Sequence, residues 1–154
     1  MKGDPFIVHF SLGIREPKSK IPGKDVAGQV EAVGASVKQF KPGDEVFGDL
    51  SACGWGAYAE YVSVPESAIA PKPANISFES AAAVPESAVV ALQGLRNNGQ
   101  IKSGQKVLIY GASGGIGTFA VQIAKSFGAE VTGVCSTRNL DMVHSIGADH
   151  IIDN

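Results

Sequence analysis

The sequence predicts an α/β protein in which a short all-β segment precedes one βαβαβ half of a doubly wound parallel sheet. Two observations lead to this fold class. Strand and helix patterns alternate near the C-terminus, which is typical of parallel sheets with helical crossovers. Short strand patterns broken by glycine and proline fill the segment before them. The alternating patterns cover residues 106–110, 118–127, 130–135, 140–146 and 150–153.

The two helix patterns in this half have clear faces and ends. Apolar residues recur at i, i+3, i+4 and i+7 spacing in the first, which predicts an amphipathic helix. These residues are Ile116, Phe119, Ala120, Ile123, Ala124 and Phe127. Gly128 and Gly147 follow the two patterns, and glycine commonly ends a helix.

The all-β segment extends from residue 22 to residue 65. Its strand patterns cover 26–33, 45–47 and 57–64, and Lys41-Pro42-Gly43-Asp44 predicts a type II turn. We expect the domain boundary between residues 84 and 85, which gives domains 1–84 and 85–154.

The segment between the strands and the parallel half predicts a loop and two helical stretches. Residues 71–75 read as the connecting loop, and Ser77 reads as the N-cap of a short helix. A second helical stretch begins after Pro85 and reaches about Asn97, with Val89, Leu92 and Leu95 on one side.

Composition and charge exclude several functional classes. The 154 residues are 44% hydrophobic and 18% charged, which suits a globular domain with a core. The net charge of −2 leaves no basic excess for nucleic acid or an anionic membrane. Cys53 and Cys135 offer no disulfide framework, which favours a reducing compartment. With no apolar signal region and no membrane span, we expect a cytoplasmic protein.

The glycine turn between the first strand and the first helix predicts a dinucleotide site. It comprises Gly111, Ala112, Ser113, Gly114, Gly115, Ile116 and Gly117. Glycines let backbone N–H groups approach a pyrophosphate, and the positive end of the helix favours the anion. We therefore interpret the βαβαβ unit as half of a Rossmann sheet. The alternative is a glycine-rich turn in some other parallel α/β protein.

Four motifs occur in order and at consistent separations, at 22–34, 41–48, 56–62 and 112–117. Together they resemble the medium-chain dehydrogenase/reductase superfamily, within it the zinc-free quinone-oxidoreductase-like branch. The resemblance implies a partial GroES-like catalytic domain at 1–84, a partial Rossmann domain at 85–154, and a nicotinamide cofactor in the cleft between them. No catalytic residue is assigned. Glu86 and Val90 depart from the family pattern, Val90 where a threonine commonly lies near the nicotinamide.

Members of that family are much longer, so the resemblance implies a fragment truncated at both ends. Met1 aligns past the first strands of the family, and Asn154 falls just after the third Rossmann strand. The first Rossmann strand, 107–110, would then expose an apolar edge. For this reason we expect self-association into a homo-oligomer, and no competent enzyme from these 154 residues alone.

The resemblance also bears on metal binding. Zinc-dependent members carry Gly-His-Glu where this chain has Gly23, Lys24 and Asp25, and they carry a cysteine cluster where it has only Cys53. The three histidines, His9, His144 and His150, lie far apart in the sequence. We therefore expect no metal. Without a Lewis acid the easier hydride acceptors are conjugated ones, so the predicted small-molecule substrate is a quinone or an α,β-unsaturated carbonyl.

The end of the second Rossmann strand predicts NADPH. NAD-binding sites usually place an acid about 20 residues beyond the glycine turn. That region of this chain holds Ser136, Thr137 and Arg138, whose hydroxyls and guanidinium suit a 2′-phosphate. In the alternative reading, Ser136 or Thr137 only caps the following helix and Arg138 is solvated.

Other functions fit parts of the sequence. The glycine spacing also occurs in short-chain dehydrogenases, but no Tyr-x-x-x-Lys pair follows it here. A truncated, non-catalytic nucleotide-binding remnant or structural module stays open as an alternative to the NADPH-dependent oxidoreductase. A crystallin-like or nucleic-acid-binding role finds no basic patch to support it.

Overall fold

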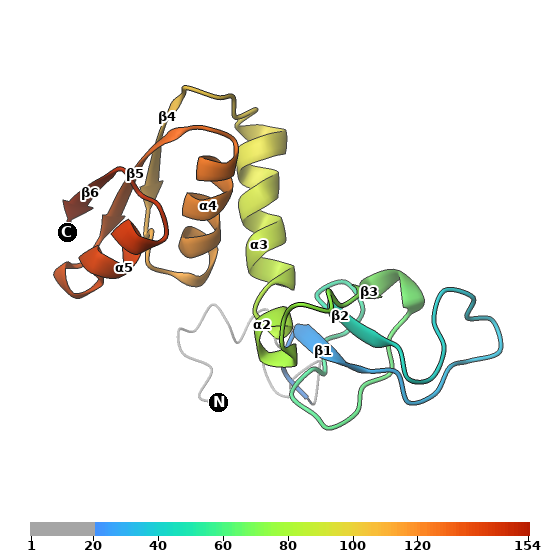
Figure 1. Ribbon diagram of the computed structural model, residues 1–154. Coiled ribbons are helices and arrows are strands. Elements are labelled where there is room, and N and C mark those ends of the chain that lie inside the picture. Colours follow the sequence, from blue (N-terminus) through green and yellow to red (C-terminus); the bar gives the residue numbers. More distant parts are fainter. Residues whose placement is uncertain (1–20) are drawn as a thin grey trace, which may run out of the picture. The chain divides into compact units, whose positions relative to one another are not determined.

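The computed structural model describes residues 21–154, which divide after Pro85 into two compact units (Figure 1). The first unit contains an antiparallel sheet in the order β1-β2-β3. Its strands are β1 (Asp25–Gln29), β2 (Glu45–Asp49) and β3 (Ile69–Pro71). Gly48 on β2 faces Val26 and Ile69 on its two neighbours, and a Cβ there would run into the carbonyl of Ala68. The central strand therefore needs glycine at this position.

The predicted turn and the predicted cap in this unit are both confirmed. The Asp44 amide donates to the Lys41 carbonyl at 3.1 Å, and Gly43 has a φ of +93°, which a type II turn requires. The Ser77 hydroxyl accepts from the Ser80 amide at 3.2 Å and begins α2 (Phe78–Ala82).

The strand predicted at 57–64 is wrong. A strand needs a continuous partner, and in the described chain this segment is held only at its start. The Gly56 and Ala57 amides donate to the Gly23 carbonyl, and the Tyr58 amide donates to the Pro22 carbonyl. Pro22 has no N–H to return, so the ladder stops there. Both tyrosines of the segment stay in solvent, with Tyr58 71% and Tyr61 75% exposed.

Other strands in the same unit also differ from the prediction: the strand predicted at 45–47 continues to Asp49 as β2. The strand predicted at 26–33 ends as β1 at Gln29, because its partner turns at Gly43 and Asp44, and within residues 21–154 no backbone bond beyond Val30 continues the ladder with β2. The short strand β3 was not predicted, and it includes Pro71 from the predicted loop.

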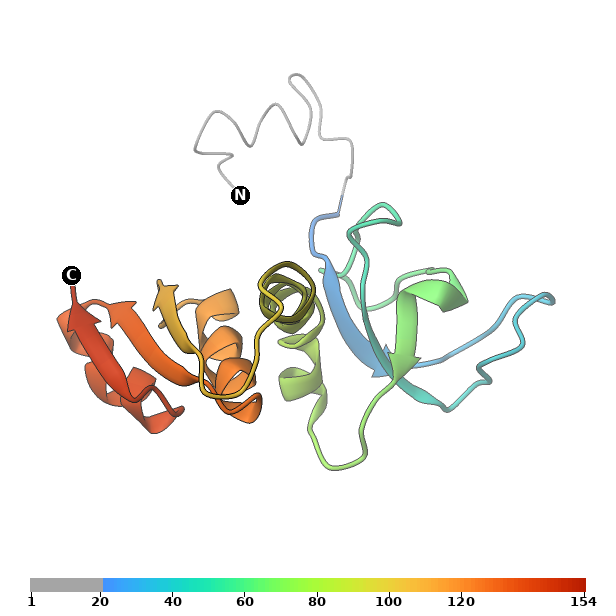
Figure 2. The same cartoon turned by 90° about the horizontal axis from the view of Figure 1, so that it is seen from above.

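The second unit contains a parallel sheet in the order β4-β5-β6, whose strands lie side by side in Figure 2. The strands are β4 (Lys106–Tyr110), β5 (Glu130–Cys135) and β6 (His150–Asp153). The helices are α4 (Gly115–Ser126), which packs on β4 and β5, and α5 (Leu140–Ser145), which packs on β5 and β6. The predicted βαβαβ order is confirmed. In the described sheet β4 is an edge strand, with Leu108 64% and Tyr110 78% exposed.

The predicted second helical stretch is α3 (Pro85–Leu92), which continues as a π-helical turn, Gln93–Asn98. Its predicted face is only partly right. Val89 is 49% exposed, whereas Ala91 is buried in the core of the second unit and Leu95 packs against that core. The π turn shifts the register of the side chains after Leu92, so one regular helical face does not persist to the end.

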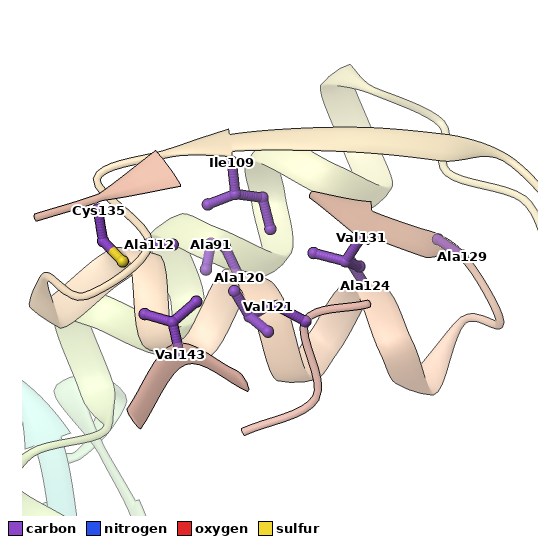
Figure 3. Packing of buried hydrophobic residues seen from close by; sticks show 11 residues of the cluster. Ala91, Ile109, Ala112, Ala120, Val121, Ala124, Ala129, Val131, Cys135 and Val143 are labelled. Carbon is purple, nitrogen blue, oxygen red and sulfur yellow. The ribbon is translucent and has the colours of Figure 1, made fainter. Parts of the chain in front are cut away.

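Small residues form the core between α4 and the sheet. Figure 3 shows Ile109 and Val131 from the strands beside Ala120, Val121 and Ala124 of α4. The predicted stripe is confirmed in its middle, where Ala120 and Ala124 are buried and Phe119 and Ile123 pack against the core. It is wrong at Ile116, which is 47% exposed, and it omits Val121, which is fully buried. Gly117 packs against the preceding turn, and positions 117, 120, 121 and 124 form the buried face of α4.

An ion pair joins α4 to the loop before β6. The Lys125 ammonium lies 2.8 Å from both Asp149 carboxylate oxygens, and the Val131 amide donates to one of them at 2.7 Å. The hydrogen bond from Lys125, and then that from the Val131 amide, hold the pKa of the Asp149 carboxyl below its usual value of 3.8. The carboxylate therefore fastens the start of β5 to the end of α4.

We expect Asp149→Asn to lower the unfolding temperature at neutral pH, with a smaller loss in acid. Because the folded pKa is lowered, the stabilisation is complete above the unfolded pKa and disappears as the pH falls through the folded value. Thermal unfolding followed by circular dichroism over this pH range measures it. Glu31→Gln removes an exposed carboxylate as the control. A loss that stays constant down to the lowest pH would contradict the role of the charge.

Candidate nucleotide-binding site

The predicted glycine turn lies between β4 and α4 and is fastened at both ends. Gly111 has a φ of +74°, a conformation that costs glycine little. The Gly114 amide donates to the Gly111 carbonyl at 3.0 Å, and the Ala112 amide donates to Val134 of β5 at 2.9 Å. The turn is thus fixed at the carboxyl end of the sheet, where ligands bind in open α/β folds.

The glycines of the turn serve different purposes. A Cβ on Gly117 would run into the Gly111 carbonyl and lie 2.9 Å from the Ala112 Cα, so this glycine permits close packing. A Cβ on Gly114 would meet only the Gly111 oxygen at 3.4 Å, and one on Gly115 only the Ser87 hydroxyl at 3.4 Å. Gly114 and Gly115 are also exposed. These two positions leave the backbone open to an approaching group.

The first turn of α4 presents unused donors. Gly114 is the N-cap and has no side chain to accept from them. The amides of Gly115, Ile116 and Gly117 have no acceptor within the helix, because the first such bond is Thr118 to the Gly114 carbonyl at 2.9 Å. No acidic side chain lies in this turn. The positive end of the helix therefore remains available to an anion.

The residues predicted to bind the 2′-phosphate lie at the end of β5. The Thr137 hydroxyl donates to Asp153 at the end of β6, with oxygen–oxygen distances of 2.8 and 3.1 Å. Arg138 is exposed, and its guanidinium has no hydrogen bond or ion pair to any residue in 21–154. The Ser136 hydroxyl accepts from the side chain of Asn139 at 3.2 Å. Among the described contacts of these three side chains, only Thr137 hydrogen-bonds to a carboxylate.

Asn139 connects the two parts of the site, a role that the sequence does not predict. Its Nδ2 donates to the Ser113 hydroxyl in the glycine turn at 3.1 Å, as well as to Ser136. An asparagine directly before a helix suggests an N-cap. Asn139 occupies that position before α5, but its side chain makes no capping bond. Ser136 makes none to the turn after it either, so the alternative capping role for this residue is not observed.

The residues considered as metal ligands lie apart. In the described part of the chain no three His, Cys, Asp or Glu side chains gather as a metal site would need. The Lys24 ammonium lies 5.4 Å from the centre of the Trp55 ring. Cys53 is exposed, and Cys135 is buried in the core. His150 lies 2.9 Å from a Glu130 oxygen on the surface, and His9 falls outside the described residues.

The two positions that depart from the family pattern lie on α3. Glu86 lies in the first turn of α3, and Val90 lies near the end of the same helix and is 44% exposed.

In residues 21–154 no helix combines the length and the apolar character needed to cross a membrane.

Two family profiles match the chain. Residues 4–74 match "Alcohol dehydrogenase GroES-like domain", and residues 115–154 match "Zinc-binding dehydrogenase". The 2-methylene-furan-3-one reductase of Solanum lycopersicum is 43% identical over 89% of this chain and 37% of its own. The mitochondrial NAD(P)H oxidoreductase RTN4IP1 of Homo sapiens is 40% identical over 99% of this chain and 39% of its own.

Among solved structures, the quinone oxidoreductase from Coxiella burnetii matches with a TM-score of 0.86 and 34% identity. The match covers 98% of this chain and 47% of that one. The chain thus spans less than half the length of these proteins. The comparisons confirm the fold class, a GroES-like antiparallel sheet followed by a Rossmann-like parallel sheet. The chain belongs to the medium-chain dehydrogenase/reductase superfamily, an oxidoreductase family, in its quinone-oxidoreductase-like branch.

Proposed function

We propose that this chain provides the cofactor site of an NADPH-dependent oxidoreductase that reduces a quinone or an α,β-unsaturated carbonyl without a metal. The first turn of α4 carries this proposal. Its free amides, the open Gly114 and the lack of an acidic side chain in this turn suit the pyrophosphate of a dinucleotide. When bound, the cofactor supplies the hydride, and the protein positions it and excludes water.

The preference for NADPH rests on Ser136 and Arg138. The guanidinium of Arg138 is exposed and pairs with no described residue, and the Ser136 hydroxyl keeps its proton. Both groups suit a 2′-phosphate. Thr137 has a different part in the proposal: because its hydroxyl donates to Asp153, it holds that carboxylate in place at the end of β6. The Asp153 charge opposes a phosphate dianion, so we propose that Arg138 offsets it.

The substrate class follows from chemistry and from the relatives. Reduction of a simple ketone develops alkoxide charge, which needs a Lewis acid or a placed proton donor. A conjugated acceptor delocalises that charge itself. Lys24 and Asp25 stand where zinc-dependent members carry a histidine-containing motif, and a lysine ammonium has no lone pair for a metal. The names of the relatives include a quinone oxidoreductase and a furanone reductase. The cytoplasmic location remains a prediction, and relatives are named as mitochondrial or chloroplastic.

The test is acceptor-dependent oxidation of NADPH by the complete protein that contains this sequence. We expect turnover with a quinone or a conjugated enone and none with a saturated ketone. Elemental analysis is expected to find substoichiometric zinc, and a chelator is expected to leave the rate unchanged. Tightly held stoichiometric zinc whose removal stops turnover would contradict the metal-free mechanism. Cofactor binding without any acceptor-dependent oxidation would favour the non-catalytic nucleotide-binding module instead.

A further inference from the structure

Asn139 is placed between the two predicted phosphate subsites. Its Nδ2 lies 3.1 Å from the hydroxyl of Ser113, in the glycine turn, and 3.2 Å from the hydroxyl of Ser136, after β5. Both contacts are partly buried. One carboxamide therefore links a turn that begins at β4 to a turn that begins at β5.

The numbers of donors and acceptors show that Asn139 is the hydrogen-bond donor in both contacts and that the serine hydroxyls are the acceptors. A carboxamide nitrogen carries two hydrogens, and here one is directed to each serine oxygen. Each hydroxyl then acts as an acceptor toward Asn139 and still has its own proton to donate. A phosphate offers only acceptors at neutral pH. The two serines are thus prepared to donate to phosphate oxygens, one in each turn.

The local helix does not explain why the side chain lies there. An asparagine at an N-cap normally accepts a backbone amide from the first helical turn. Asn139 precedes α5, yet its side chain makes no such bond. The side chain hydrogen-bonds to the two serines instead of capping α5.

We propose that Asn139 is a positioning residue for NADPH, which fixes the Ser113 hydroxyl as a donor to the pyrophosphate and the Ser136 hydroxyl as a donor to the 2′-phosphate. The proposal rests on the nucleotide site described above and adds to it a residue that acts through two others. It implies that the two serines lose their common orientation when the carboxamide nitrogen is replaced by an acceptor.

Asn139→Asp is the decisive variant. Aspartate has nearly the same shape, but its carboxylate only accepts, so it would draw both hydroxyl protons away from the phosphates and add a negative charge. We expect the affinity for 2′-phospho-ADP-ribose, measured by calorimetry, to fall about tenfold or more, and the affinity for ADP-ribose to fall less. Asn97→Asp adds the same charge on the π-helical turn, where Asn97 accepts from Arg96, and is expected to leave both affinities unchanged.

A mutant cycle separates positioning from a structural role. In the otherwise unchanged protein, Asn139→Ala is expected to weaken the binding of 2′-phospho-ADP-ribose. In a protein whose Ser113 and Ser136 are both replaced by alanine, it is expected to have little further effect on that binding. Thermal unfolding without nucleotide shows whether each variant remains folded. An equal loss in both backgrounds, or a folded Asn139→Asp protein with natural affinities, would overturn the proposal. If the natural protein binds neither fragment, the proposed function itself fails, and this inference with it.

Discussion

Gly114→Val is expected to leave the fold intact and to abolish nucleotide binding. Gly114 has φ −81° and ψ 171°, an extended conformation that valine adopts readily. A Cβ there would meet only the Gly111 oxygen at 3.4 Å, so a side chain at this position would not clash with the rest of the protein. The same branched side chain would cover the amides at the start of α4, which a pyrophosphate must reach.

Two other glycines supply the comparison for this variant. Gly34→Val adds the same side chain where a Cβ would meet nothing within 4 Å and is expected to bind normally. Gly117→Ala adds only a methyl group, but it would run into the Gly111 carbonyl and is expected to lower the unfolding temperature strongly. Calorimetry with NADPH and thermal unfolding distinguish the three outcomes. A folded Gly114→Val protein with undiminished affinity would show that the turn does not hold the pyrophosphate.

The sequence predicts the parallel half closely because its signals are local. The bounds of β5 and β6 match the predicted 130–135 and 150–153, and glycines end the two helices that were expected to end there. The segment 57–64 alternates like a strand but is not one, because alternation reports side-chain direction and says nothing about a partner for the backbone.

In the candidate site, too, the sequence predicts the local features but not the contacts between distant residues. The glycine turn is contiguous and could be read from the sequence, as could Ser136 and Arg138 by counting along a Rossmann unit. Asn139 could not, since its contact with Ser113 joins residues 26 positions apart and its sequence context indicates a helix cap. Asp153 was likewise missed as a neighbour of Thr137, because only the register of β5 with β6 brings them together.

Arg138→Ala is expected to weaken the binding of NADPH by about 1.5–3 kcal/mol, which is the range for a lost hydrogen bond to a charged group. The binding of NADH is expected to change little. The exposure of Arg138 favours the lower end and predicts that the loss shrinks as salt is added, since solvent-exposed charges are screened. Arg138→Lys is expected to recover only part of the affinity, because an ammonium cannot form the paired bonds of a guanidinium.

Arg96→Ala is the matched control for this variant. It removes the same charge from the π-helical turn, whose Leu95 lines a hollow together with Lys106 at the amino end of β4. The carboxyl ends of the strands, where Arg138 follows β5, lie at the opposite edge of the sheet. A long-range charge effect would lower NADPH affinity in both variants, whereas a phosphate contact affects only Arg138. If Arg138→Ala weakens NADPH and NADH equally, the residue supports the turn after β5 and the preference for the 2′-phosphate must come from elsewhere.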